Sequence, residues 1–166
     1  MIQVRRLTLA EAPAFRALRL DALRDHPADF GSTHATEAML PLAHFVGQLA
    51  DNHVLGVFLD GVLTGVAAIG FRAKAKEAHR ADLWGVYVAP GGQGRGAAQA
   101  LVDAALAVGF ARAEHIELSV RVGNARALAL YRSRGFVATG TELRSYRVDG
   151  RDYDNTLMVK FRPATT

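Results

Sequence analysis

The sequence predicts a mixed α/β (α+β) fold, organised as a single domain over residues 1–166. Three observations support this prediction. A chain of 166 residues is long enough to bury one sizeable core. Its apolar residues alternate between strand-like and helix-like spacing along the whole length. No repeat, low-complexity tract or Pro/Gly/Ser-rich linker divides it.

The first fifty residues are typical of a strand followed by two helices. Thr8 and Glu11 have the spacing of a capping box, which marks a helix start. Pro27 forces the residue before it out of the helical region. The expected elements are a strand over 2–7, a helix over 12–23, a loop over 26–32, and a helix over 35–49 that is interrupted near Pro41.

A β-hairpin is expected next. Residues 54–59 and 62–71 are strongly β-forming, and the Asp60-Gly61 pair between them suits a two-residue type I′ turn. A polar turn over 74–77 follows, and then a strand over 81–88. The sequence therefore places three strands in succession ahead of residue 89.

The turn after this strand has the features of a phosphate site. Pro90 ends the strand, and apolar residues at helical spacing resume at Ala97. Gly94 and Gly96 thus fall where the first backbone N–H groups of a helix have no intrahelical partner. Open donors at the positive end of a helix dipole attract phosphate oxygens. A plain helix cap without a ligand is the alternative interpretation.

Two common phosphate loops do not fit these residues. A Walker A loop would end in Gly-Lys-Ser/Thr, which is absent. A dinucleotide fingerprint would place Gln99 where Gly or Ala is needed for close packing of the helix on the strand. What remains is the pattern Gln93-x-x-Gly96-x-Ala98 directly after a strand.

A second informative segment begins at residue 115. Residues 115–122 alternate polar and apolar as a strand does, and a helix is expected over 125–134, closed by Gly135. Asn124 and Tyr131 are seven residues apart, which is two helical turns, so they are expected on one face. A strand over 136–138 and a last one over 155–161, pairing antiparallel, complete the chain.

Together these two segments resemble the GNAT superfamily of N-acetyltransferases. The first resembles its acetyl-CoA loop, Gln/Arg-x-x-Gly-x-Gly/Ala, and the second its Asn-x-x-Ala-x-x-Leu-Tyr-x-x-x-Gly-Phe segment. The resemblance is firm from about Asp82 to Phe136. It implies a GNAT-like, mostly antiparallel sheet of about six to seven strands with splayed central strands, flanked by about four helices.

The resemblance also implies the cosubstrate and the residues that hold it. Acetyl-CoA would lie between the splayed strands, with its pantetheine amides and acetyl carbonyl on main-chain groups of the strand and its pyrophosphate on the amides of the loop. Asn124 would reach the cofactor arm, and Tyr131 would lie beside the thioester sulfur. The expected cofactor-binding residues are Val86, Tyr87, Val88, Gln93, Gly94, Arg95, Gly96, Ala97, Ala98, Gln99, Asn124 and Tyr131.

The implied reaction is direct attack of a primary amine on the thioester in a ternary complex. A protonated amine cannot attack, so a base is needed, and Asp82 is the candidate, on one strand face with Trp84 and Val86 unless a bulge near Gly85 shifts the register. Tyr131 is the candidate proton donor to the leaving thiolate. The structural alternatives are an Asp82 paired with Arg80 or Arg72, and a Tyr131 that belongs to the core.

The acceptor is not identified by the sequence. A small-molecule or peptide amine fits the resemblance, and a homodimer is a family-level expectation. Candidates for the acceptor side are Asp29, Phe30, Glu37, Trp84, Tyr153 and Asp154. The competing hypothesis is a catalytically silent acyl-CoA-binding or sensing domain; a nucleotide-binding enzyme is a more remote one.

Composition excludes several other classes. The net charge of +4 is spread as scattered basic residues, so no nucleic-acid partner is expected. No apolar run approaches membrane-spanning length and the N-terminus lacks a signal-peptide core, so we expect no membrane partner and a cytoplasmic location. Cysteine is absent, which excludes a cysteine acyl-enzyme, and the six histidines lack metal-ligand spacing, so no metal site is expected.

Overall fold

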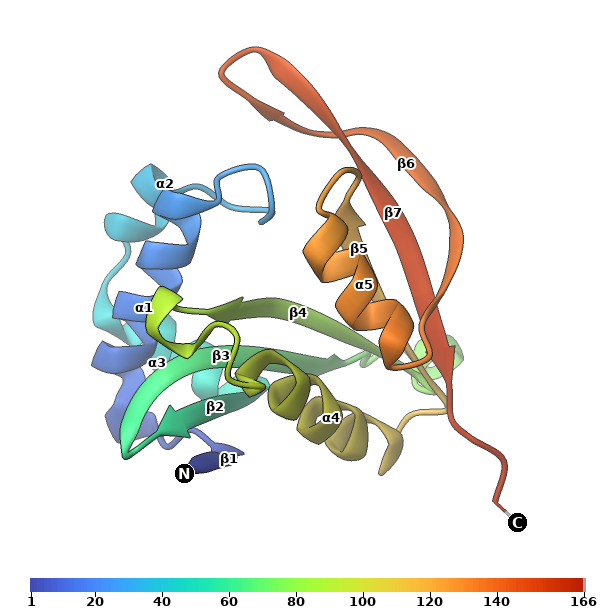
Figure 1. Ribbon diagram of the computed structural model, residues 1–166, viewed down its shortest axis with the longest axis horizontal. Coiled ribbons are helices and arrows are strands. Elements are labelled where there is room, and N and C mark those ends of the chain that lie inside the picture. The colour runs from blue at the N-terminus through green and yellow to red at the C-terminus, as the bar shows by residue number, and fades with distance from the viewer. Residues whose placement is uncertain (166) are drawn as a thin grey trace.

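One seven-stranded sheet runs through the computed structural model, which describes residues 1–165, and helices lie on both of its faces (Figure 1). The strand order is β1-β2-β3-β4-β5-β7-β6, antiparallel throughout except between β4 and β5. The elements are β1 (Ile2–Arg6), α1 (Ala12–Asp25), α2 (His34–Ala38), α3 (Leu42–Asp51), β2 (His53–Leu59), β3 (Val62–Phe71), β4 (Arg80–Val88), α4 (Ala97–Phe110), β5 (His115–Arg121), α5 (Ala125–Ser133), β6 (Val137–Val148) and β7 (Arg151–Phe161).

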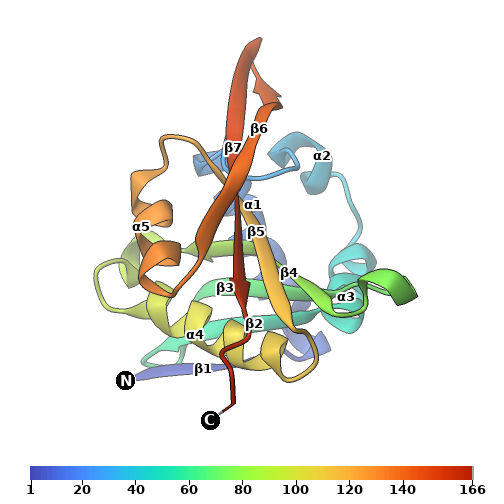
Figure 2. The same ribbon diagram turned by 90° about the vertical axis from the view of Figure 1, so that its right-hand side faces the viewer.

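The two faces of the sheet carry separate cores. Helices α1 and α3 pack on one face, where Phe15 and Phe45 meet edge to face with ring centroids 6.2 Å apart. Helix α4 covers the other face, with Leu101 and Val102 fully buried, and α5 continues that layer beside β5 (Figures 1 and 2). In the described residues, no helix combines the length and apolar character needed to cross a bilayer.

The predicted elements of the first ninety residues are confirmed, including their turns. Asp60 and Gly61 both have positive φ (50° and 83°), as a type I′ turn requires. Glu11 accepts the Thr8 backbone N–H at 2.7 Å at the start of the first helical segment. The second predicted helix is divided into α2 and α3 because Pro41 lies in extended backbone between them. This division explains why five helices are found where about four were expected.

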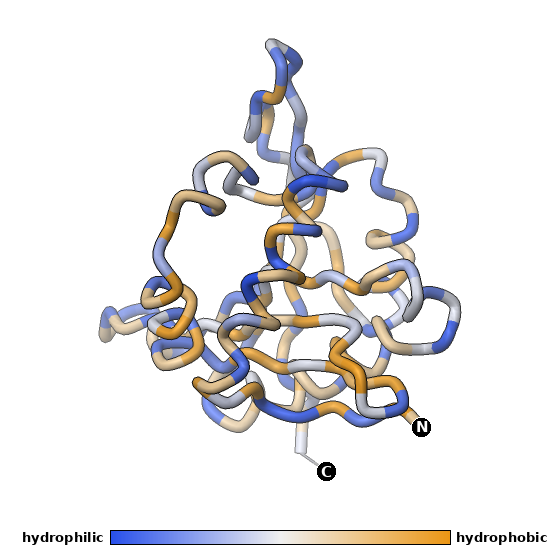
Figure 3. Tube along the Cα trace, turned by 90° about the vertical axis from the view of Figure 1, so that its left-hand side faces the viewer, coloured by the Kyte–Doolittle hydropathy of each residue, from blue (hydrophilic) through white to orange (hydrophobic). Residues whose placement is uncertain are grey.

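The last hairpin is much longer than predicted. We expected strands over 136–138 and 155–161, but β6 and β7 extend to a turn at Asp149-Gly150, where both residues have positive φ. The added part projects from the molecule and is mostly hydrophilic (Figures 1 and 3). Because no residue of β6 is buried, the segment lacks the alternation that identifies a strand with one buried face.

Strands β4 and β5 diverge, as the resemblance implied. They pair in parallel over only three residues, ending at Asp82 opposite Glu117. Beyond that point β4 continues along β3, and β5 follows β7 toward the projecting hairpin (Figure 2). The remainder of each strand therefore borders a gap in the sheet.

A buried ion pair fixes α2 against α1. Arg19 donates from Nε and Nη2 to the two carboxylate oxygens of Glu37, at 3.0 and 2.9 Å, and both side chains are almost fully enclosed. The Arg19 guanidinium also lies 5.6 Å from the Phe30 ring and 5.9 Å from the Trp84 ring. The paired Arg19 guanidinium thus lies next to two aromatic side chains.

We expect Glu37→Ala to cost about 3–5 kcal/mol of unfolding free energy, since it leaves the buried Arg19 charge without a partner. The matched control is Asp25→Ala, which removes an exposed partner of Arg24 and should cost far less stability than Glu37→Ala. Urea titrations at pH 7 measure both. Equal, small losses in the two variants would contradict the role given to the buried pair.

The capping carboxylate predicts a pH dependence of stability. The Arg5 guanidinium, followed by the Thr8 backbone N–H, lowers the pKa of Glu11 from 4.5 to about 2. Because the folded-state pKa is depressed, the stabilisation is complete above about pH 4.5 and is lost as the pH falls toward 2. Glu11→Gln should therefore be less stable than wild type above about pH 4.5, and the difference in unfolding free energy should shrink as the pH falls toward 2. Urea unfolding at a series of pH values measures this difference. A deficit that stays constant with pH would contradict this assignment; exposed Glu114→Gln serves as the control.

Candidate active site

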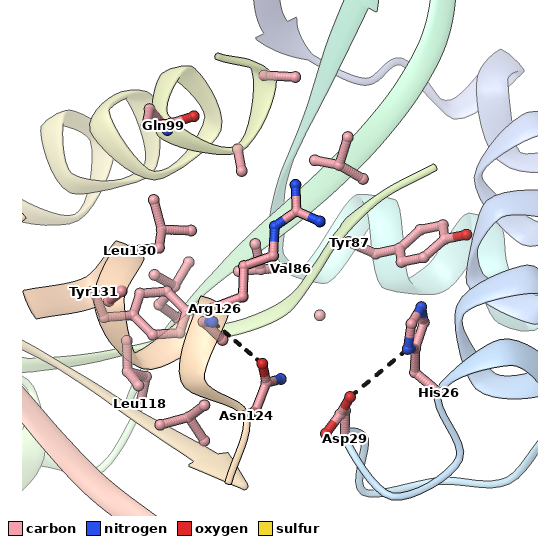
Figure 4. A pocket seen from close by; sticks show the side chains of 18 of the residues that line it. His26, Asp29, Val86, Tyr87, Gln99, Leu118, Asn124, Arg126, Leu130 and Tyr131 are labelled. Atoms are coloured by element: carbon pink, nitrogen blue, oxygen red, sulfur yellow. Dashed lines mark hydrogen bonds and ion pairs between the residues drawn. The ribbon is translucent and has the colours of Figure 1, made fainter. Parts of the chain in front are cut away.

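A cleft of about 580 Å³ occupies the gap between the diverging strands. It is lined by the loop between α1 and α2, the end of β4, the turn before α4, the end of β5 and residues of α5 (Figure 4). All of these segments except the α1–α2 loop belong to the two parts of the sequence that resemble an acetyltransferase. The sheet divergence thus brings them to one site.

The turn before α4 presents unused hydrogen-bond donors to this cleft. The first main-chain bond into α4 runs from the Ala100 N–H to the Gly96 carbonyl, at 3.0 Å. Across residues 1–165, none of the amides from Gly94 to Gln99 finds an acceptor in the protein. Gly94 and Gly96 have φ of 73° and 80°, a conformation that glycine adopts at little cost. Several N–H groups therefore converge at the positive end of a fourteen-residue helix.

Close packing against β3 holds this turn in place. The Ala89 N–H donates to the Thr64 carbonyl at 2.8 Å. A Cβ on Gly92 would lie 2.6 Å from the Thr64 methyl group and 2.8 Å from Val88 Cγ1, so only glycine fits there. The donors of the turn are thus held in a fixed position before any ligand arrives.

Side chains at the two ends of the turn take different directions. Gln93 lines the cleft and accepts from Arg126 Nη1 of α5 at 3.0 Å, which places a guanidinium next to the turn that carries the open amides. Arg95, expected among the cofactor residues, is outside the lining; its guanidinium lies 3.4 Å from Asp60. Only the Arg95 main chain can contribute, because its side chain turns toward the β2–β3 turn. Gly94, Gly96, Ala97, Ala98 and Gln99 all line the cleft.

A bulge in β4 changes which side chains share a face. Gly85 has φ of 63°, and the register with β3 shifts between the pairs Ala68–Trp84 and Val66–Tyr87. Val86 consequently packs toward the α4 core, whereas Trp84 packs with the α1 core. The expectation that Val86 shares a face with Asp82 and Trp84 is wrong, because the bulge at Gly85 shifts the register of β4. Val86, Tyr87 and Val88 nevertheless all line the cleft.

Asp82 lies where the strands separate and does not line the cleft. Both of its oxygens accept from Arg72, at 2.9 and 2.7 Å, and the same Arg72 Nη2 reaches Glu117 at 2.7 Å. Arg80 also binds Glu117. Two facing carboxylates would repel each other, so the arginines are needed to hold the strands together here. This contact is the structural alternative described above; Asp82 as a base stays a prediction.

Tyr131 and Asn124 face the cleft from α5. Asn124 caps the helix rather than lying within it, and its Oδ1 accepts the Ala127 N–H at 3.2 Å. The Tyr131 ring packs edge to face on Phe136 with centroids 5.8 Å apart. Burial raises the pKa of Tyr131, so the phenol keeps its proton at neutral pH. In the described part of the chain its hydroxyl has no hydrogen-bond partner, which leaves it available to a ligand.

The opposite end of the cleft has a different chemistry. Asp29, Phe30 and Trp84, three of the residues expected on the acceptor side, line it, and their role toward an acceptor stays a prediction. Three other expected residues do not: Glu37 is buried against Arg19, Tyr153 lies beside Arg121 and Arg151, and Asp154 accepts the Arg144 N–H in the projecting hairpin. The two aromatic side chains at this end are thus accompanied by the carboxylate of Asp29.

Three functional-site residues were missed by sequence reasoning. His26 and Arg121 line the cleft beside Asp29, and Arg126 lines the end near the helix amides. Arg126 follows Asn124 by two residues, and this proximity was an available signal. No signal in the sequence pointed to His26 or Arg121, because they lie in segments that are far apart in the chain. No group of three or more metal-ligating side chains occurs within residues 1–165.

The comparisons with known proteins agree with this geometry. Residues 16–136 match the acetyltransferase (GNAT) family. A 114-residue stretch is 40% identical to the N-alpha-acetyltransferase RimI of Mycobacterium tuberculosis, covering 68% of this chain and 70% of that protein. The structure of a ribosomal-protein-alanine N-acetyltransferase from Brucella melitensis superposes with a TM-score of 0.84 at 27% identity, covering 96% and 99% of the two chains.

A fold-level match comes from an acetyltransferase structure of Salmonella typhimurium described with its cofactor acetyl-CoA. It superposes with a TM-score of 0.82 at 22% identity and covers all of this chain and 96% of that one. The seven-stranded sheet, the divergence of β4 and β5, and the open amides before α4 are the features of this chain that fit such a cosubstrate. The chain belongs to the GNAT family of acetyltransferases and is an acetyl-CoA-dependent N-acetyltransferase.

Proposed function

We propose that this enzyme acetylates the α-amino group of a peptide or protein N-terminus by direct attack on the thioester. The observation that carries the donor half is the set of unpartnered amides from Gly94 to Gln99 at the edge of the cleft. The acceptor half is supported by the names of two relatives, an N-alpha-acetyltransferase and a ribosomal-protein-alanine N-acetyltransferase. Direct attack is favoured because the sequence has no cysteine to carry the acyl group.

The donor would be held mostly by main-chain groups. The open amides of the turn bind its diphosphate, and Arg126 supplies a positive charge beside them. The end of β4 has no ladder bonds to β5, so main-chain groups of Val86 and Val88 are left to bind the acetyl carbonyl and the pantetheine amides. The Asn124 side-chain amide, whose oxygen caps α5, has its nitrogen free to reach the same arm.

Two groups would act on the reacting atoms. The Val86 N–H stabilises the oxyanion that develops on the acetyl carbonyl, a preorganised interaction that is typically worth about 3 kcal/mol. The Tyr131 hydroxyl donates to the departing sulfur, since its raised pKa keeps it protonated and no protein acceptor competes for it. The two groups lie on opposite walls of the cleft, on β4 and α5 (Figure 4).

The acceptor class is tested with matched peptides. Thiol release is measured with one peptide carrying a free N-terminus and no lysine, and with its N-terminally blocked counterpart carrying one internal lysine. We expect turnover with the free N-terminus alone. Exclusive turnover of the lysine peptide or of small amines would refute the acceptor assignment. Absence of thiol release with both peptides and with small amines would favour the silent acyl-CoA-binding alternative.

Gly96→Glu should weaken acetyl-CoA binding at least about 100-fold, a loss of about 2.7 kcal/mol. The new carboxylate stands beside the phosphate-binding amides, and a side chain at φ 80° also strains the turn. Titration calorimetry measures the affinity. The matched control is Gly91→Glu, which places the same charge in open space outside the cleft lining. Wild-type affinity in a folded Gly96→Glu protein would remove the loop assignment.

Tyr131→Phe should lower kcat by roughly 100-fold while acetyl-CoA affinity stays within about 2-fold, because only the proton donor is lost. Pre-steady-state kinetics confirm that chemistry limits turnover. Tyr146→Phe, outside the cleft lining, is the control for loss of a phenol elsewhere. If kcat is unchanged, Tyr131 has only a packing role.

A further inference from the structure

The cleft contains few groups able to accept a proton from an amine. Among its lining residues within the described chain, the candidates at neutral pH are His26 and Asp29. Arg121 and Arg126 are cations, and burial raises the pKa of both Tyr87 and Tyr131, which keeps them protonated. Asp82 is outside the lining and engaged by Arg72.

A tight turn places His26 and Asp29 side by side. His26 caps the end of α1, Pro27 follows it, and the Asp29 N–H donates to the His26 carbonyl at 3.1 Å. Pro at the second position is typical of such a turn. The carboxylate Oδ2 of Asp29 lies 3.8 Å from His26 Nδ1 (Figure 4). The two side chains are therefore paired by local geometry.

Asp29 is itself held from across the cleft. Arg121, at the end of β5, donates from Nε to Asp29 Oδ1 at 2.5 Å, and the Asp29 side chain is only 17% exposed. The His26 side chain is 47% exposed, and its ring centre lies 6.0 Å from that of Tyr87 on β4. One imidazole nitrogen thus faces a fixed carboxylate, and the other is left for a ligand in the cleft.

We propose that His26 is the general base that takes the proton from the acceptor ammonium, and that Asp29 is a positioning residue that orients the imidazole. This inference rests on the proposed function. An imidazole is the side chain that ordinarily titrates nearest neutral pH. It matches a peptide α-amino group, which ordinarily loses its proton near pH 8, better than a lysine amine near pH 10.4.

The step conserves protons. His26 takes one proton from the acceptor ammonium and later releases it to solvent. The freed nitrogen lone pair forms the N–C bond to the acetyl carbon, and the C–S bond breaks with its electrons on sulfur. Tyr131 protonates that sulfur, and the second proton lost by the nitrogen returns to the phenol through solvent. The products are the amide, the free thiol and one proton.

Several charged groups lie around the imidazole and the Tyr87 ring that it faces. They are Asp21, Arg24 and Asp25 on α1, Asp29 in the loop and Arg121 on β5. Variants that test the base should leave these groups unchanged.

The test is the pH profile of kcat/KM with the free N-terminal peptide, for wild type, His26→Gln and Asp82→Asn. We expect His26→Gln to lose the acidic limb and at least about 100-fold in rate near pH 7, with acetyl-CoA affinity within about 2-fold. Added imidazole should restore part of the rate of His26→Ala, because the histidine side chain is half exposed at the cleft. His34→Gln, outside the cleft lining, should match wild type.

Other outcomes overturn the proposal. An acidic limb and rate retained in His26→Gln would exclude His26 as the base. Loss of that limb in Asp82→Asn alone would assign the base to Asp82. If the wild-type protein turned over no amine at all, the proposed function would fail, and the assignment of His26 would fail with it. If the wild type is active and His26→Gln is equally active, only the assignment of His26 as the base is refuted.

Discussion

The short parallel pairing of β4 with β5 is the constraint on which the rest of the molecule depends. Three residue pairs join the strands, and the last pair sets Asp82 opposite Glu117. Arg72 and Arg80 neutralise these carboxylates and hold the strands together at this end. Beyond these ion pairs the two strands separate, and the cleft lies in the gap between them. A sheet that paired along its full length would have no site there.

The two ends of the cleft are built by different means. One end uses backbone: open amides before α4 and unpaired strand edges, which are present whatever the side chains are. The other end uses side chains from distant segments, with Asp29 and Arg121 joined across the opening and Phe30 and Trp84 beside Arg19. In the function proposed above, the backbone end binds the acetyl donor and the side-chain end selects the acceptor.

Much of the fold was predictable from local patterns. The Asp60-Gly61 turn, the Thr8 and Glu11 cap and the break at Pro41 follow from residue-level geometry, and the structure has each one. The long β6–β7 hairpin was not predictable, because its residues are exposed on both faces and burial alone produces strand periodicity. The face of Val86 was also missed, since one bulge residue inverts every later side chain.

The sequence by itself determined the reaction class, because it carries two short motifs, a glycine turn that opens a helix and an asparagine that caps a later one, and the residues of each motif are adjacent in the chain. Tertiary structure alone decided which side chains meet at the reacting end. Asp82 pairs with Arg72, Glu37 is buried against Arg19, and Asp29 binds Arg121, which is far from it in the chain. The physical reason is that charged side chains pair with whatever folding places within reach, and sequence spacing carries no record of those distances.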